Sequence, residues 1–455
     1  MPNTIKIMIK LLIGKGPNPF SVRFTLLTPF FLLTLLSIAS GESNRSVERS
    51  ADASVPYLTT TQPLTLVSAN DGRTLVQRDS RGLFDKTRVP AQDSLTVIHL
   101  GPDHPPIVKT VYGTVSSTIL GSPFMAMSAN GRYGFVVHHS WNGPPFSEYW
   151  PEITPLPEEQ ANGLTVVDLN SPELTVVGRL ALPPFPLLVL PLPDGERVIV
   201  LNGTTFFVIA MRDGKPEVVS TSPSPIVGLS MAVSPVGDRI VVTGFSGDHI
   251  PAEFPPPEKF TAHLFSLSGG KIAYLHEISI RAGLPAKFNG AFTPRFSPDG
   301  KRILVLNGVG LGGKGTLDDV LSIDMTAEPP QVTEVIPQVG DGLESLAFHP
   351  SGKFAVISCL EEFTPGNALT SYSHLAVIDL TTTPARLLYH LPVEAYPEGI
   401  EFTPDGSKLF VGLTDAHRIA AFDVEGFLLK RNPFVLQVGH GPAVMALGRG
   451  YTQKK

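Results

Sequence analysis

Short runs in which apolar and other residues alternate follow one another along most of this chain, with turn-forming residues between them. Alternation with a period of two is typical of β-strands, because successive side chains of a strand point to opposite faces of the sheet. Residues 164–169, 375–380 and 419–424 show it clearly. The 42 Gly and 44 Pro among 455 residues are too many for a helical protein and suit short strands joined by tight turns. The pattern predicts an all-β fold.

A turn motif recurs seven times, and each copy is expected to lead into a strand. Its fullest form is Ser297-Pro-Asp-Gly300-Lys301, in which Gly supplies the positive φ that such a turn needs. The copies occupy residues 68–73, 128–132, 192–196, 234–238, 297–301, 349–353 and 403–407. The third and fourth copies are separated by about the length of one four-stranded propeller blade, which takes roughly 40–45 residues.

The third repeat is the most compact, and we expect its four strands at residues 187–190, 197–201, 206–211 and 217–220. Seven such repeats predict a seven-bladed β-propeller of four-stranded antiparallel blades over residues 61–449. Residues 439–447 resemble an innermost strand without a blade of its own, which would close the ring by pairing with the first blade. Residues 64–67 compete for the same place, so the register of closure stays open.

The Pro-Asp-Gly-Lys turn and the Val-Ile-Asp-Leu strand, seen at residues 298–301 and 377–380, resemble the YVTN-type bacterial β-propeller repeat. That family is similar to the 6-phosphogluconolactonase-like and quinoprotein amine dehydrogenase β-chain-like propellers. The resemblance spans residues 60–449 and implies the fold. It leaves the function open, because such propellers include lactonases, cofactor-bearing redox domains and binding scaffolds.

A carboxylate recurs near the end of the third strand in four repeats, at Asp168, Asp324, Asp379 and Asp423. A catalytic carboxylate would not need to be repeated from blade to blade. We expect these side chains to accept hydrogen bonds from nearby backbone amides and so to cap the following turn.

Residues 1–40 are predicted to be an export signal, in which four basic residues precede an apolar stretch at residues 24–38 and small residues follow. The apolar stretch is shorter than the ~20 residues of a membrane-spanning helix. An uncleaved anchor remains the alternative. A polar tail at residues 41–60 would lead into the propeller, and we expect the protein in the periplasm or outside the cell, with no membrane span after cleavage.

The formal net charge of −6 becomes more negative once the signal is removed. No basic cluster remains that could neutralise phosphates, so nucleic acid is excluded as an expected partner. Cys359 is the only cysteine, so it cannot form an intramolecular disulfide, and we expect it to be a small buried apolar residue.

Five repeats carry long segments between their second and third strands, at residues 78–94, 138–162, 245–260, 308–319 and 360–374. In a four-stranded blade these connections all leave one face, where they would surround the mouth of the central channel. Loops on a rigid scaffold often carry binding residues. The segment at 308–319 contains Gly-x-Gly-x-x-Gly, but a strand rather than a helix is expected to follow it, so we reject nucleotide binding.

The segment at residues 138–162 is the predicted site for a protein or small-molecule ligand, because it holds both tryptophans of the chain. Trp and Tyr are common at the centre of recognition surfaces. The alternative is that the rings pack this Pro-rich loop onto its neighbours. The candidate binding residues are His138, His139, Trp141, Phe146, Tyr149 and Trp150.

No cofactor is predicted, although the histidines leave a divalent metal open. His138, His249 and His440 are the candidate ligands, with His374 and His417 expected on the same face. Imidazole ligands suit zinc and other transition metals. Each of these histidines comes from a different blade or connection, and no close ligand spacing such as His-x-His appears.

Glu344 and Glu398 occupy equivalent positions, four residues before the end of the predicted innermost strands of blades 6 and 7. With His440 they are the candidate catalytic residues. Two carboxyls at the channel mouth would act as an acid–base pair or bind a cation. The alternative is a pair of solvated or backbone-bonded glutamates lining a wet channel.

These observations favour an exported, non-catalytic β-propeller that binds a ligand or partner through its long loops. The first alternative is a lactonase-type hydrolase that uses the His and Glu residues of the channel mouth, with or without a metal. The second, a redox subunit, rests on the family resemblance.

Overall fold

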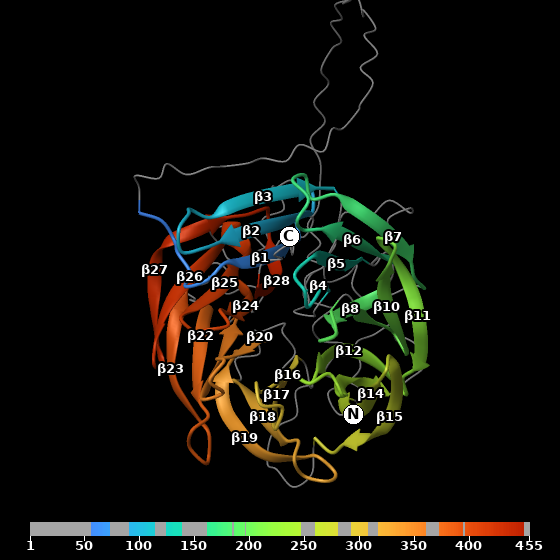
Figure 1. Cartoon of the computed structure of the whole chain (residues 1–455). Coiled ribbons are helices and arrows are strands. Elements are labelled where there is room, and N and C mark those ends of the chain that lie inside the picture. The colour runs from blue at the N-terminus through green and yellow to red at the C-terminus, as the bar shows by residue number, and fades with distance from the viewer. Residues whose placement is uncertain are drawn as a thin grey trace, which may run out of the picture. The chain divides into compact units, whose positions relative to one another are not determined.

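The computed structural model describes residues 56–72, 91–113, 124–138, 162–183, 186–195, 197–246, 260–280, 293–307, 317–360, 373–394 and 396–449. In these ranges the strands form seven four-stranded antiparallel sheets, arranged as blades around a ring (Figure 1). The predicted seven-bladed β-propeller is confirmed. The expected export signal at residues 1–40 lies outside the described ranges, and no helix within them has the length and apolar character needed to cross a membrane.

Each blade is given from its innermost strand outwards. Blade 1 contains β28 (Pro442–Arg449), β1 (Leu64–Asn70), β2 (Ser94–Leu100) and β3 (Ile107–Tyr112). Blade 2 contains β4 (Met125–Met127), β5 (Tyr133–His138), β6 (Gly163–Asp168) and β7 (Val176–Ala181). Blade 3 contains β8 (Pro186–Pro191), β9 (Val198–Asn202), β10 (Thr205–Arg212) and β11 (Lys215–Pro223). Blade 4 contains β12 (Ile226–Val233), β13 (Arg239–Ser246), β14 (Phe260–Ser268) and β15 (Lys271–Ile278).

Blade 5 contains β16 (Pro294–Phe296), β17 (Arg302–Asn307), β18 (Asp318–Asp324) and β19 (Gln331–Gly340). Blade 6 contains β20 (Leu343–Phe348), β21 (Phe354–Cys359), β22 (Ser373–Asp379) and β23 (Arg386–Val393). Blade 7 contains β24 (Pro397–Phe402), β25 (Lys408–Leu413), β26 (Arg418–Glu425) and β27 (Leu428–Gln437). A short 3₁₀ turn, η5 (Thr414–Ala416), joins β25 to β26.

The two ends of the described chain meet in blade 1, where β28 pairs with β1 (Figure 1). The predicted closure by the C-terminal strand is confirmed, and β1 takes the second place in the blade. The first copy of the turn motif was therefore predicted wrongly. Ser68 to Asn70 lie inside β1. The innermost strand of this blade is β28, which comes from the other end of the chain, so no turn joins it to the second strand β1.

The other six copies of the motif are turns between the innermost and second strands, as predicted. Their glycines all have positive φ: Gly131, Gly195, Gly237, Gly300, Gly352 and Gly406. The turns also pack from blade to blade. A Cβ added to Gly237 would lie 2.8 Å from the ring of Pro193 in the preceding turn, and Pro235 stands in the same way beside Gly300. Glycine is needed at both positions for its conformation, and at Gly237 also for its small size.

The recurring aspartates behave as predicted in three of four blades. Asp168, Asp324 and Asp379 each accept a hydrogen bond from the backbone amide two residues later, at 3.0, 2.8 and 2.9 Å. The prediction was wrong for Asp423. Its carboxylate instead contacts Lys408 Nζ at 2.5 Å and Asn432 Nδ2 at 2.9 Å, so a neighbouring cation replaces the turn amide.

Apolar residues of adjacent blades pack together and form the core between the sheets. One cluster joins Val67 of blade 1, Phe135 of blade 2 and Val200 of blade 3, all fully buried. Cys359 is fully buried in the cluster between blades 5 and 6, which confirms its expected role as a small apolar residue.

A β-bulge recurs near the start of the innermost strand. The register shifts by one residue in β8, β12, β20, β24 and β28 where each pairs with the second strand of its blade. In β24 the extra residue is Gly399, at φ 64°. Because a bulge sets two residues opposite one, Glu398 and Glu401 lie on the same side of this strand although they are three residues apart.

Candidate functional site

The long insertions all leave the ring at one face. They follow the second strands and precede the third: β5 ends at His138 before β6 begins at Gly163, and the same connection is long in blades 1, 4, 5 and 6. It is short in blades 3 and 7, as expected. The innermost strands begin at this face, because each runs antiparallel to the second strand beside it. We call it the loop-bearing face.

Most of the predicted binding residues lie in these insertions. His139, Trp141, Phe146, Tyr149, Trp150 and His249 lie outside the described residues. The part of the loop-bearing face that the structure describes consists of the strand ends below the loops. It includes the candidate catalytic residues.

Glu344 and Glu398 are the second residues of β20 and β24, just inside the loop-bearing face. Their side chains are buried, with 3% and 0% of the surface exposed. The Oε1 atom of each lacks a hydrogen-bond partner among the described residues. The alternative of solvated glutamates was therefore wrong. The structure places two poorly hydrogen-bonded carboxyl groups inside the protein.

Burial raises the pKa of Glu344 to about 8. The pKa of Glu398 is raised well above its ordinary value, first by burial and then by the negative charges of Glu344, Asp71 and Asp415. A carboxylate in a low-dielectric site beside another carboxylate is costly, so such pairs titrate together and hold a proton near neutral pH. One carboxyl that keeps its proton beside one that loses it is the arrangement that general acid–base catalysis requires.

Ring closure brings the start of β28, the innermost strand of blade 1, close to Glu398. The hydroxyl of Thr414 donates a hydrogen bond to Pro442 O at 2.9 Å, and it lies 3.5 Å from Oε2 of Glu398. The amide of Gly441 donates to Nδ1 of His417 at 3.2 Å, and the rings of His417 and His440 lie 4.3 Å apart. Ring closure thus places His440 beside His417, on the segment that leads to Pro442, and no contact between His440 and either glutamate is seen among the described residues.

The other histidines occupy separate places. His138 is buried at the end of β5, where its Nε2 lies 3.1 Å from Thr165 Oγ1. His374 packs against His390, whose Nε2 donates to Val339 O at 2.6 Å. Among the side chains in the described ranges, no group of three or more His, Cys, Asp or Glu residues is placed to hold a metal ion.

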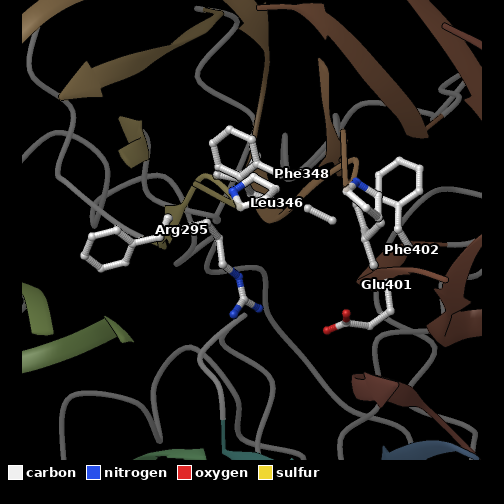
Figure 2. Close-up of a pocket in the computed structure, with 10 residues that line it drawn as sticks. Arg295, Leu346, Phe348, Glu401 and Phe402 are labelled. Atoms are coloured by element: carbon white, nitrogen blue, oxygen red, sulfur yellow. The ribbon is translucent and has the colours of Figure 1, made fainter. Parts of the chain in front are cut away.

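A pocket that the sequence reasoning missed opens farther along the innermost strands of blades 5, 6 and 7. Its volume is about 210 Å³. The lining includes Arg295 of β16 and Glu401 of β24, whose charged ends extend into the same space (Figure 2). Both residues stand two positions before the turn motif, where blades 2, 3 and 4 have Ala126, Leu190 and Ala232. Aligning the repeats position by position would have exposed these two charges.

Comparison with known proteins supports the fold. No family model matches the chain, and no curated protein matches it by sequence. A Bacteroides uniformis protein described as a putative 6-phosphogluconolactonase is similar with a TM-score of 0.55 and 15% identity, over 85% of this chain and 100% of that one. The periplasmic gluconolactonase of Pseudomonas aeruginosa has a TM-score of 0.54 and 12% identity, over 85% and 99%. Hydrazine synthase of Kuenenia stuttgartiensis has a TM-score of 0.51 and 18% identity, over 73% and 91%. These likenesses show the propeller fold alone.

The buried carboxyl pair predicts how stability depends on pH. The folded state keeps a proton on Glu344 up to a pKa of about 8, whereas the unfolded chain loses it near an ordinary pKa of ~4.3. The free energy of unfolding should therefore fall as pH rises between these two values. Glu344→Gln replaces the carboxyl with a neutral group of the same shape. We expect it to unfold a few degrees higher than the wild type at pH 8 and at nearly the same temperature at pH 5.

The measurement is thermal unfolding of both proteins from pH 5 to pH 8. Glu217→Gln on the exposed strand β11 is the matched control, and it should follow the wild-type profile at every pH. Parallel profiles for the wild type and Glu344→Gln would mean that Glu344 titrates as an ordinary surface carboxyl.

Proposed function

We propose that this chain is an exported β-propeller that binds a ligand or a partner protein through its loop-bearing face. The observation that carries the proposal is the placement of the long connections. All five join the second strand of a blade to the third, so they leave one face of a rigid ring. Insertions confined to one face of a repeat fold often mark its binding surface.

The composition of the longest of these connections supports the proposal. The segment between β5 and β6 holds both tryptophans with Phe146 and Tyr149. Large aromatic side chains contribute most of the energy at many binding surfaces and lose little conformational entropy on binding. A binding scaffold needs no catalytic group in these loops.

Export is part of the proposal. It is supported by the basic and apolar segments of residues 1–40. The periplasmic gluconolactonase among the fold neighbours is a protein of that compartment, which agrees with it. The compartment is the periplasm or the cell exterior.

A lactonase-type hydrolase is the second candidate, and the buried pair Glu344 and Glu398 favours it. In this function the carboxyl that is ionised takes a proton from water as the water attacks the lactone carbonyl. The protonated carboxyl gives its proton to the ring oxygen as the carbon–oxygen bond breaks, and the product is a hydroxy acid. Three fold neighbours are named as lactonases, two of them as putative ones. The redox alternative has no comparable support from the described residues.

Removal of the aromatic loop tests the binding scaffold. Replacing residues 141–150 by a Gly-Ser linker of equal length should abolish capture of the partner or ligand that the wild type retains. The reason is that this change removes the aromatic contacts and leaves the strands intact. The measurement is affinity capture from the extracellular and periplasmic fractions, with each retained molecule then titrated against both purified proteins.

Val236→Ser is the control, because Val236 is the most exposed large apolar residue in the described ranges and lies in a turn on the opposite face. The control should bind as the wild type does. Equal retention by the wild type and the loop replacement would contradict the scaffold as proposed here.

Hydrolysis of lactones tests the second candidate. If the pair is catalytic, Glu398→Gln and Glu344→Gln should each lower kcat by about 10²–10⁴, the usual contribution of a general acid or base. The measurement is ring opening of a panel of aldonolactones followed by pH-stat, with Glu425→Gln, an exposed carboxyl of β26 in the same blade, as a matched control that should keep full activity. A folded wild type inactive on the whole panel, or variants that keep full activity, would exclude this pair as a hydrolase site.

A further inference from the structure

The pocket of blades 5, 6 and 7 is separate from the loop-bearing face. It is lined by the C-terminal halves of β20 and β24 and by Pro298 and Pro350 of the turn motifs, whereas Glu344 and Glu398 stand at the other ends of the same strands. At about 210 Å³ it is smaller than the ~300–1,000 Å³ of pockets that hold drug-sized ligands. Its occupant must be a small molecule.

Arg295 supplies the positive charge of the pocket. It is the only cationic residue in the lining as the structure describes it. Its side chain is half-buried, and among the described residues its guanidinium makes no hydrogen bond or ion pair. A partly desolvated guanidinium that has no acceptor among the described residues favours an anionic partner, because an unpaired charge away from water is costly.

Glu401 faces Arg295 across the pocket without pairing with it (Figure 2). Burial raises the pKa of Glu401 to about 7, although the nearby charge of Arg295 opposes the shift. Around neutral pH a large fraction of Glu401 is therefore protonated and neutral. In that form the carboxyl donates a hydrogen bond instead of neutralising the arginine. The space between the two groups carries a positive charge and offers a second donor.

The remaining lining is apolar and repeats from blade to blade. Phe296, Phe348 and Phe402 occupy the same position in three successive repeats, with Leu346 and Ile400 between them. These residues also pack into the clusters between the blades, and the parts of them that line the pocket form an apolar wall beside the two charged groups. The charged end of the pocket fits a more specific group. One guanidinium balances one negative charge, and its two parallel N–H donors match the two oxygens of a carboxylate.

We propose that this pocket binds a small monocarboxylate, with Arg295 holding the carboxylate, Glu401 donating a further hydrogen bond, and the apolar lining contacting the rest of the molecule. A phosphate dianion fits less well, because the lining offers a single cation. The site goes beyond the proposed function, since it lies away from the loop-bearing face and does not depend on what that face binds.

Titration with acetate, lactate and benzoate tests the site, with acetamide and benzamide as neutral counterparts of similar shape. Isothermal titration calorimetry on the full mature chain should give one saturable site for at least one carboxylate, with a Kd on the order of 1 mM or tighter. The matching amide should bind at least 10-fold more weakly. Arg295→Gln should weaken carboxylate binding at least 10-fold, and Arg295→Lys should weaken it less, because the charge remains and the two parallel donors are lost.

Two further variants complete the experiment. Glu401→Gln keeps a neutral donor and should retain binding within a few-fold at pH 7. Lys301→Gln removes an exposed positive charge from the same blade and should leave the Kd unchanged. Unfolding temperatures confirm that each variant is folded. Absence of saturable binding by all three carboxylates, or equal Kd values for folded Arg295→Gln and wild type, would overturn the proposal.

Discussion

Closure of the ring by β28 against β1 is the interaction on which the rest of this structure depends. A propeller blade packs only against its two neighbours, so an open ring would leave two apolar blade faces in water. Here seven ladder partners join Leu64–Asn70 to β28 across nearly the whole length of the chain. A buried polar network strengthens the joint: Asn70 donates to Thr96 Oγ1 at 2.9 Å, and Thr96 Oγ1 accepts from Gly439 N at 3.3 Å.

The same closure builds the candidate site. The segment that leads into β28 sets His440 beside His417 and brings Pro442 to Thr414, next to Glu398. Asp71, which follows β1, raises the pKa of Glu398 by its charge. Residues from both ends of the propeller thus surround a carboxyl of blade 7. The buried pair costs folding free energy above its ordinary titration range, and a ring closed on both sides supplies the packing that keeps it in place.

Much of the fold could be predicted from sequence, because the same local sequence pattern occurs in several blades. Six turn motifs and the third strands were identified correctly, since Gly at positive φ and period-two alternation are local signals. The first motif copy failed for a non-local reason. Ser68 to Asn70 have turn-forming side chains, yet pairing with β2 and β28 draws them into a strand, where Asn70 satisfies the polar network. Local propensity was overridden by the closure.

The site was predictable only in part. Glu344 and Glu398 were found because they recur at one repeat position, but the contact of Glu398 with the segment that closes the ring in blade 1 cannot be read from spacing. Arg295 and Glu401 were missed because each is a single charge in a different blade, and only their shared position in the repeat connects them. The aromatic residues of the 138–162 insertion remain a prediction from composition.

Hydrogen exchange of the amides in β1 and β28 tests the closure most directly. The account predicts that peptides covering residues 64–70 and 442–449 of the full chain are protected together, and as strongly as the second and third strands of blades 3 to 7. Rapid exchange in 442–449 while those strands remain protected would show a ring that is not sealed by its C-terminal strand, and would contradict the account.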